Sequence, residues 1–341
     1  MTTTPEELHP VLSVIVPMHN EAAGLDRLFA RLRPLLEATV SSFEVVCVDD
    51  GSTDETFSHL RRIAAGDARI RVLRLSRNFG KETAMTAGLD FASGQAVIPL
   101  DADLQDPPEV IPVMVRKWRE GYDIVYAIRQ HRSSDGTTKR ATAGSFYRLF
   151  NRLADHPIPQ DVGDFRLMDR RVVLALRGYR ERTRFMKGLF ASVGFHQTGI
   201  EYDREPRAAG ASKWSYWQLW NLALEAITSF TSTPLRAWSY IGAALAVPAG
   251  LYAAWLVVRT VLFGIDVPGY ASLAVMILLF GGLQLLSIGI LGEYVARIFI
   301  EAKERPLYIV ESTLGIADAV GQEVAERCRD VIVCRERSAR I

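Results

Sequence analysis

VIPLDADLQDPPE, from Val97 to Glu109, joins a short apolar run directly to three aspartates, a glutamine and two prolines. An apolar run of this length followed by turn residues is typical of a buried strand. Carboxylates this close repel one another, which raises their pKa values or destabilises the chain unless a cation lies between them. The stretch therefore predicts a buried strand that ends in an acidic site for a positively charged partner.

The runs on either side of this stretch have the same character. Strand-like runs occur at residues 11–17, 43–50, 69–76, 95–101 and 122–128, and helical spacing occurs around 21–38, 54–65, 81–93 and 108–120. Strands that alternate with helices predict an α/β fold with a mainly parallel sheet, covered by helices on both faces. Ligands of such sheets bind at the carboxyl ends of the strands. The acidic stretch follows the fourth strand, so it lies at this edge.

Asp101, Asp103 and Gln105 occupy alternate positions after the fourth strand. Their oxygens are hard ligands that suit Mg²⁺ or Mn²⁺, which proteins bind through one or two carboxylates completed by substrate phosphates. Taken alone, an acidic turn of this kind is more often a solvated turn. The choice between a metal site and a solvated turn depends on the neighbouring strand ends.

A second acidic strand end favours the metal site. VDDGSTDET, Val48 to Thr56, ends the second strand in Asp49 and Asp50. We expect Asp49 to accept a hydrogen bond from a nucleotide base and Asp50 to assist at the metal site. We also expect Ser52 and Glu55 to form a capping box for the next helix. Two acidic strand ends in one parallel sheet indicate a site for a metal and a nucleotide.

Two other phosphate-binding motifs are excluded. NFGKET contains Gly80 and Lys81, but a P-loop requires a glycine where Leu75 stands and a hydroxyl where Glu82 stands. The first strand–helix turn, VPMHNEA, has no GxGxxG fingerprint. The nucleotide is therefore expected to bind through carboxylates and a metal, as a diphosphate does.

Charge and cysteine content narrow the class of protein further. The formal net charge of the 341 residues is +1, which argues against a nucleic-acid partner. The three cysteines, Cys47, Cys328 and Cys334, cannot all pair and match no metal spacing, which favours a reducing compartment. The first ten residues lack a basic region followed by an apolar one, so we expect no signal peptide.

The composition changes near residue 214. WSYWQLWNLALEAITSF contains three tryptophans and one carboxylate, and it is typical of an amphipathic helix in a membrane interface. Two runs without charge follow, Ala237 to Val258 and Val267 to Gly292, and each reaches the ~20 residues that span a bilayer core. Buried helices of a large soluble core are the alternative. The charges flank the runs, which favours a membrane: Arg236, Arg259 and Arg297.

The short connection FGIDVPGY predicts that the two membrane helices form a hairpin, with both soluble ends on one side. Basic residues around Arg204 to Arg236 and Arg297 to Arg305 predict that this side is the cytoplasm. We therefore expect a multi-pass protein of the inner (cytoplasmic) membrane, with its α/β domain in the cytoplasm. The expected parts are an α/β domain, an interfacial helix, two transmembrane helices and a cytoplasmic tail, at residues 1–213, 214–235, 236–300 and 301–341.

Six motifs together carry a family resemblance: VIVPMHNE, VDDGSTDET, LSRNFGKETAMTAGLDFASG, DADLQDPPE, GDFRLMDR and RAAGASKW. In this order they resemble inverting glycosyltransferases of family 2. More closely, the chain looks like the polyprenyl-phosphate glycosyltransferases, the group of dolichol-phosphate mannose synthase and the bactoprenol glucosyltransferases. The resemblance covers residues 10–312 and implies a GT-A-like nucleotide-sugar-binding sheet. Residues 313–341 fall outside it, and we expect them to form a short helix with a charged end.

The resemblance implies roles for the matching positions. The nucleotide sugar would contact Pro17, Asn20, Glu21, Asp49, Asp50, Lys81 and Asp101. The catalytic residues would be Asp103 and Asp164, and the metal ligands would be Asp101, Asp103 and Gln105. Basic side chains would meet the lipid phosphate, with solvated surface as their alternative: Arg129, Lys139, Arg140 and Arg207, together with Ser212 and Lys213.

The implied reaction moves a sugar from a nucleotide diphosphate to polyprenyl (undecaprenyl) phosphate at the cytoplasmic membrane face, with inversion at the anomeric carbon. Mg²⁺ or Mn²⁺ would assist. The second pKa of a phosphate monoester is near 6, so this acceptor is largely anionic at neutral pH and needs no strong general base. Glucose from UDP-glucose is the expected donor, while GDP-mannose and UDP-linked amino sugars stay open.

Two other functions are less well supported. A processive membrane polysaccharide synthase requires more membrane helices and typically a QxxRW block, whereas this chain has only PLRAW. A non-enzymatic membrane scaffold would tolerate broken acidic motifs, and the motifs here are intact. Whether several copies assemble into a homo-oligomer stays open.

Overall fold

The described residues fall into two compact units. The computed structural model describes residues 10–130, 162–182, 184, 186–203, 233–263, 269–316, 324 and 331–333. One unit contains every described strand, and the other contains two long helices, α9 (Thr233–Phe263) and α10 (Tyr270–Ala302).

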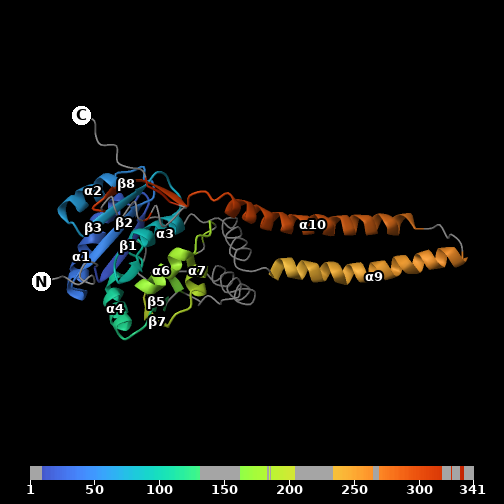
Figure 1. Ribbon diagram of the computed structural model, residues 1–341, viewed down its shortest axis with the longest axis horizontal. Coiled ribbons are helices and arrows are strands. Elements are labelled where there is room, and N and C mark those ends of the chain that lie inside the picture. The colour runs from blue at the N-terminus through green and yellow to red at the C-terminus, as the bar shows by residue number, and fades with distance from the viewer. Residues whose placement is uncertain are drawn as a thin grey trace, which may run out of the picture. The chain divides into compact units, whose positions relative to one another are not determined.

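The first unit is built on a nine-stranded sheet of order β7-β5-β6-β4-β1-β2-β3-β8-β9 (Figure 1). The strands are β1 (Leu12–Met18), β2 (Phe43–Asp49), β3 (Ile70–Leu75), β4 (Ala96–Pro99), β5 (Ile124–Arg129), β6 (Val162–Asp169), β7 (Gln197–Tyr202), β8 (Tyr308–Leu314) and β9 (Val331–Val333). Strands β4, β1, β2 and β3 are parallel neighbours, whereas β6 is antiparallel to both β4 and β5. The predicted α/β fold with a mainly parallel sheet is confirmed.

Helices cover both faces of this sheet. They are α1 (Leu25–Thr39), α2 (Thr56–Gly66) and α4 (Ile111–Arg119) on one face, and α3 (Lys81–Phe91), α6 (Arg170–Gly178) and α7 (Met186–Ser192) on the other. Leu28 and Leu32 of α1 share a buried cluster with Val14 of β1. On the opposite face, a Cβ added to Gly88 of α3 would lie 2.1 Å from the Cγ2 atom of Ile15. Successive residues of a strand point to opposite faces, so β1 is buried by both helical layers.

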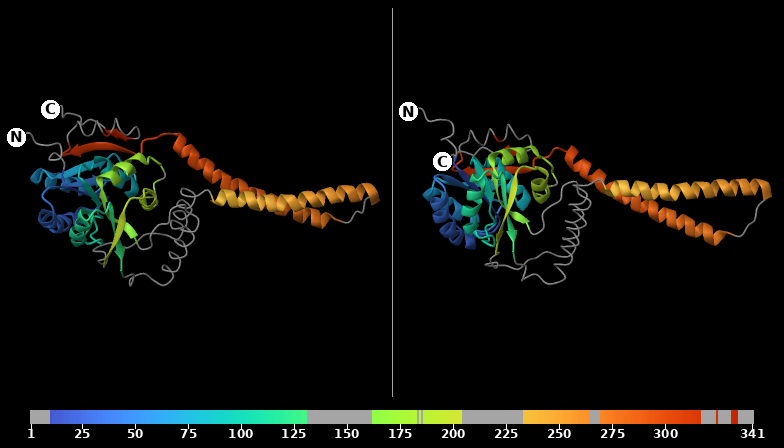
Figure 2. Two further views of the ribbon diagram at one scale, coloured as in Figure 1. Left: turned by 60° about the horizontal axis from the view of Figure 1, so that its bottom comes forward. Right: turned by 90° about the horizontal axis from the view of Figure 1, so that it is seen from below.

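The chain returns to the first unit after α10, where β8 pairs antiparallel with β3 (Figure 2). Tyr308 of β8 is fully buried, and its hydroxyl donates to Asp90 Oδ2 at 2.8 Å. Arg180 donates to the same carboxylate through both terminal nitrogens, at 2.8 and 2.9 Å. The pattern of the sequence did not predict this strand. Most of the short helix expected at residues 313–341 lies outside the described residues.

The described residues of the second unit form two apolar helices that lie side by side (Figures 1 and 2). Trp238 of α9 donates through Nε1 to Ser287 Oγ of α10. Within the described part of the chain, one helical segment, Leu279–Ala302, is long and apolar enough to cross a membrane, and none of it is buried. The predicted two-helix transmembrane hairpin therefore stays a prediction. The expected interfacial helix falls largely on residues 214–232, outside the described ranges.

We predict that Tyr308→Ala lowers the free energy of unfolding by about 3–5 kcal/mol, because it removes a fully buried aromatic side chain. Tyr308→Phe should lower it by about 1–3 kcal/mol, because the buried Asp90 carboxylate loses one donor. Urea denaturation of the full chain in detergent, followed by circular dichroism, measures both effects. Tyr240→Phe is the control, since Tyr240 is 75 % exposed. Equal stability of all three variants would contradict a structural role for β8.

Candidate active site

A cavity of about 260 Å³ lies at the carboxyl ends of the central strands. Strand β1 lies between β2 and β4, so the loops after these three strands are neighbours. Six predicted residues line the cavity: Pro17, Glu21, Asp50, Lys81, Asp101 and Asp103. The remaining lining residues were not among the predicted site residues: Met18, His19, Asn78, Gly80, Ala84 and Ala102. The structure thus brings both acidic strand ends to one cavity.

Lys81, the first residue of α3, supplies a positive charge at this cavity. Its Nζ lies 2.7 Å from Asp101 Oδ1 and 3.2 Å from Asp164 Oδ2. Burial disfavours the charged ammonium, but the carboxylates of Asp101 and Asp164 outweigh this effect and hold the pKa of Lys81 above its ordinary value. Lys81 therefore stays protonated and compensates two carboxylates that come from different strands.

The two carboxylates beside Lys81 differ in their pKa values. Burial raises the pKa of Asp101, and the ion pair with Lys81 only partly offsets that rise. Burial also acts on Asp164, but the positive charges of Lys81, Lys187 and Arg166 hold its pKa below the ordinary value. The Oδ1 atom of Asp164 is buried and has no hydrogen-bond partner among the described residues. Asp164 thus presents an ionised carboxylate with one free acceptor.

The donor set at the end of β4 fits a cation that shares its ligands with a substrate. Asp101 and Asp103 line the cavity, and Asp103 Oδ1 accepts from the backbone N–H of Gln105 at 3.1 Å. Gln105 itself does not line the cavity. Within the described ranges, no three His, Cys, Asp or Glu side chains are grouped so that they could hold a metal ion. Binding of Mg²⁺ through one or two carboxylates, completed by substrate phosphates, matches this donor set.

The two aspartates at the end of β2, Asp49 and Asp50, accept hydrogen bonds from neighbouring loops. Asp50 accepts from the backbone N–H of Phe79 at 2.7 Å and of Gly80 at 2.9 Å, which fixes the turn before α3. Gly80 has a φ of +97°, a conformation that favours glycine. Asp49 is fully buried, and its Oδ1 accepts from the backbone N–H of Ser52 at 3.0 Å. The contact expected between Asp49 and a base stays a prediction.

The expected capping box at the start of α2 is wrong. The Ser52 hydroxyl accepts from the backbone N–H of Asn20 at 3.0 Å, and Glu55 accepts from the Ser58 hydroxyl. Asp54 provides the side-chain acceptor at the start of α2 instead, because its Oδ1 accepts from the backbone N–H of Thr56 at 3.0 Å. The Ser52 hydroxyl is bonded to the loop after β1 instead of to the helix, and the spacing of residues in the sequence cannot predict a contact with another loop.

Asn20 joins the loops after β1 and β2. Its Oδ1 accepts from the backbone N–H of Thr53 at 2.8 Å and of Asp54 at 3.3 Å. The backbone of Asn20 has a φ of +57°, which asparagine tolerates better than most residues. Asn20 therefore fixes the wall of the cavity rather than lining it.

Arg129 lies at the end of β5 in a largely buried network. Its Nε donates to the Tyr202 hydroxyl at 3.2 Å, its Nη2 lies 3.8 Å from Asp106 Oδ1, and Tyr202 in turn donates to Asp106. Gly163 makes room for this arginine, since a Cβ there would lie 2.9 Å from Nη2. The other predicted lipid-phosphate residues lie outside the described residues: Lys139, Arg140, Arg207, Ser212 and Lys213.

Glu82 is a titratable residue beside the site, and it was not among the predicted site residues. Its Oε2 accepts from the backbone N–H of Met186 at 3.0 Å, which links α3 to α7. Burial, and after it the negative charge of Asp164, raises the pKa of Glu82 to about 7. The one signal in the sequence is its position directly after Lys81 at a helix start.

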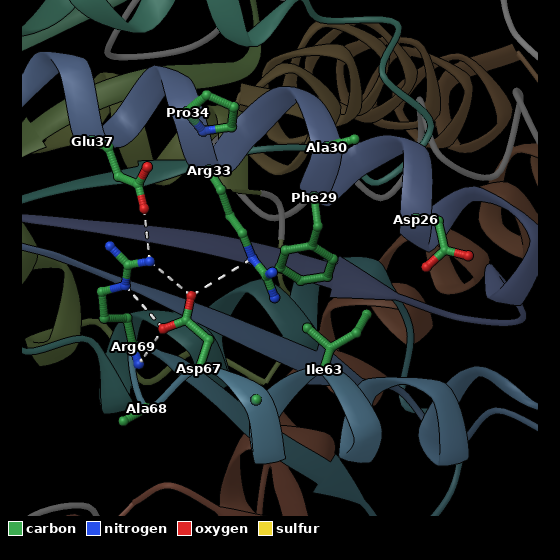
Figure 3. Close-up of a pocket in the computed structure, with 11 residues that line it drawn as sticks. Asp26, Phe29, Ala30, Arg33, Pro34, Glu37, Ile63, Asp67, Ala68 and Arg69 are labelled. Carbon is green, nitrogen blue, oxygen red and sulfur yellow. Dashed lines mark hydrogen bonds and ion pairs between the residues drawn. The ribbon is translucent and has the colours of Figure 1, made fainter.

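A larger cavity of about 790 Å³ lies between α1 and α2, next to the loop before β3 (Figure 3). Charged residues that line this cavity form ion pairs with one another: Asp67 Oδ1 lies 2.9 Å from Arg69 Nε, and Glu37 Oε1 lies 2.8 Å from Arg69 Nη2. It contains none of the predicted site residues. The smaller cavity at the carboxyl ends of the strands is therefore the candidate active site.

Comparisons with known proteins identify the family. Residues 13–176 match the glycosyl transferase family 2. The chain is 48 % identical over 301 residues to the bactoprenol glucosyl transferase of Shigella phage SfV, covering 88 % of this chain and 98 % of that protein. It is 47 % identical over 300 residues to the prophage bactoprenol glucosyl transferase homolog of Escherichia coli (strain K12), with coverage of 88 % and 98 %. The chain belongs to glycosyl transferase family 2.

The expected resemblance of this glycosyltransferase to the bactoprenol type is confirmed by these relatives. An uncharacterized glycosyltransferase of Synechocystis sp. is 51 % identical over 305 residues, covering 89 % of this chain and 96 % of that protein. Among solved structures, glucosyl-3-phosphoglycerate synthase from Mycobacterium tuberculosis, in complex with Mn²⁺, UDP-glucose and phosphoglyceric acid, is 21 % identical. It aligns with a TM-score of 0.46 over 65 % of this chain and 79 % of that chain.

We predict that Glu82→Gln flattens the pH dependence of stability of this glycosyltransferase. The pKa of Glu82 is raised from 4.5 to about 7 in the folded state, so the folded protein binds an additional proton between these values. The stability that Glu82 contributes is therefore complete below pH 4.5 and is lost as the pH rises through about 7.

Thermal unfolding midpoints measured from about pH 4 to pH 8 test this expectation. The wild type should lose stability over that range relative to Glu82→Gln, which keeps a neutral side chain throughout. Glu120→Gln removes an exposed carboxylate at the end of α4 and serves as the control. Parallel profiles for the wild type and Glu82→Gln would contradict the assignment.

Proposed function

We propose that this glycosyltransferase transfers a sugar from a nucleotide-diphosphate donor to the phosphate of a polyprenyl lipid, with inversion at the anomeric carbon. The donor that we favour is UDP-glucose. The main support is the cavity at the carboxyl ends of β1, β2 and β4, where Asp101, Asp103 and Lys81 meet. An acidic edge that carries one cation suits a diphosphate together with a metal ion.

Mg²⁺ or Mn²⁺ fits the residues present at this edge. The ion pair between the Lys81 ammonium and Asp101 supports a position that attracts positive charge. Asp101 and Asp103 would hold the metal, with Gln105 as a further oxygen donor. When bound, the metal would neutralise charge on the departing diphosphate.

The protein residues position the two reactants. An oxygen of the acceptor phosphate forms the new bond to the anomeric carbon, and the bond between that carbon and the diphosphate oxygen breaks, with its electron pair leaving on the diphosphate. A lipid phosphate is largely anionic at neutral pH, so no strong base is required. Asp164 suits an orienting role, because its lowered pKa keeps it ionised and makes it a weak base. Lys81 would move its charge towards the leaving diphosphate.

The lipid acceptor is supported by relatives at 47–48 % identity that carry the name bactoprenol glucosyl transferase and are covered over 98 % of their length. Arg129 is the described basic residue proposed to face the acceptor. It is bound to Tyr202 and Asp106, so it would present its charge from a fixed position. The other proposed contacts, Lys213 among them, precede the tryptophans expected at headgroup depth.

We expect the purified full chain to transfer labelled glucose from UDP-glucose to a short-chain polyprenyl phosphate only when a divalent cation is present. A panel of UDP-glucose, UDP-N-acetylglucosamine and GDP-mannose, each with and without acceptor, identifies the donor. Asp103→Asn should lower turnover by about 100-fold or more, because it removes a proposed metal ligand. Glu109→Gln should leave turnover unchanged, because Glu109 is paired with Arg31 and does not line the cavity. Undiminished transfer in excess EDTA would contradict the metal requirement. Transfer of glucose without polyprenyl phosphate would contradict the proposal that this lipid is the acceptor.

We also propose that α9 and α10 form a transmembrane hairpin with both soluble ends in the cytoplasm. Both helices are rich in exposed apolar side chains, such as Val261, Phe263 and Leu285. The protein should stay in the membrane during alkaline carbonate extraction. Single cysteines introduced at two exposed positions, as Ser41→Cys and Glu311→Cys, should react with a membrane-impermeant maleimide only after the membrane is opened. If only one of these two positions is labelled in intact cells, the two ends lie on opposite sides of the membrane. The hairpin is then wrong, and the chain crosses the membrane once.

A further inference from the structure

We propose that Lys81 is a built-in counter-cation that keeps divalent metal out of the Asp101 site until a nucleoside diphosphate binds. This inference rests on the proposed function, because it assumes that the acidic edge receives a metal and a diphosphate. It assigns Lys81 a positioning role: Lys81 sets the order in which the metal and the nucleotide bind.

The ammonium of Lys81 engages both oxygens of Asp101. Nζ lies 2.7 Å from Oδ1 and 2.8 Å from Oδ2, and it also lies 3.2 Å from Asp164 Oδ2. A metal ion bound to either Asp101 oxygen at about 2.1 Å would stand within about 5 Å of Nζ. Like charges at that separation repel strongly in a partly buried site. The ammonium and the metal therefore compete for Asp101.

The protein alone offers the metal few ligands in return. Around this edge, as elsewhere in the described residues, no group of three His, Cys, Asp or Glu side chains could hold a metal ion. A metal that displaces Lys81 must therefore take most of its remaining ligands from water or from a substrate. A diphosphate supplies anionic oxygens for the metal and a new partner for the lysine, since lysine binds phosphate as a point charge. Binding of the nucleotide thus has two effects: it gives Lys81 a new partner, and it supplies the metal with its missing ligands.

Lys81 is placed so that it can change partner. Its side chain is 45 % exposed, so it can move within the cavity without disturbing the core. Its backbone is fixed, because it follows Gly80, whose N–H donates to Asp50 at 2.9 Å. A fixed backbone with a long, exposed side chain permits a local exchange of ion pairs. Binding of metal and of nucleotide should then be mutually favourable, since coupling between two ligands is reciprocal.

The test measures binding of Mn²⁺ alone to the full chain in detergent, by electron paramagnetic resonance or calorimetry. Lys81→Met should bind Mn²⁺ about tenfold or more tightly than the wild type, because one neighbouring charge commonly shifts ionic equilibria at carboxylates by this much. Lys81→Arg keeps the charge and should resemble the wild type.

Lys187→Met is the matched control. The charge of Lys187 also acts on Asp164, but Lys187 belongs to α7 and its effect comes after that of Lys81. If Lys187→Met strengthens Mn²⁺ binding as much as Lys81→Met, any nearby positive charge has this effect. The proposed competition between Lys81 and the metal for Asp101 is then wrong. If Lys81→Met binds Mn²⁺ no better than the wild type, the competition does not exist.

Repeating the titrations with UDP and with GDP tests the coupling. The nucleotide that binds should strengthen Mn²⁺ binding by the wild type, and should do so less in Lys81→Met. Equal Mn²⁺ affinity of the wild type with and without a bound nucleotide would overturn the inference, even if Lys81→Met did not fold. None of these measurements uses an acceptor or turnover. A failure of sugar transfer to polyprenyl phosphate is therefore distinguishable from a failure of the cation competition.

Discussion

The compensation of negative charge at the end of β4 is the constraint on which the site depends. Asp101 and Asp164 come close together in a partly buried edge because the ammonium of Lys81 lies between them. Glu82 illustrates a carboxylate for which burial prevails over the neighbouring cations, since its pKa rises to about 7. Burial and the neighbouring cations therefore act together on the pKa values of the carboxylates at this edge.

The strands up to β5 were predictable from the sequence because their signal is local: an apolar run followed by a turn and a helical repeat. Strand β6 was not predictable in this way. It inserts antiparallel between β4 and β5, although β5 follows β4 along the chain. Pairing across such distances depends on tertiary packing. The meeting of Asp164 with Asp101 is a consequence of this insertion, so spacing alone could not show it and only the family resemblance pointed to it.

Individual side-chain partners were harder to predict than the site as a whole. The segment from Asp49 to Thr56 contains several donors and acceptors with similar reach, and short polar side chains readily bond to nearby backbone. In the structure the backbone N–H of Asn20, in the loop after β1, donates to the Ser52 hydroxyl. The Asp54 carboxylate accepts from the backbone N–H of Thr56 at the start of α2. A capping box is a sensible expectation for an isolated helix. Here the neighbouring loop supplies a competing donor.

The acidic loop after β4 is paired at both ends with cations from other elements. Asp101 is bound by Lys81 of α3, and Asp106 is approached by Arg129 of β5 and bound by Tyr202. Asp103 lies between these anchors and lines the cavity. Since Lys81 belongs to the proposed donor side and Arg129 to the proposed acceptor side, a change of partner at either anchor acts on the same short loop. Asp103 therefore lies in a loop whose two ends are each paired with a charged residue from another element.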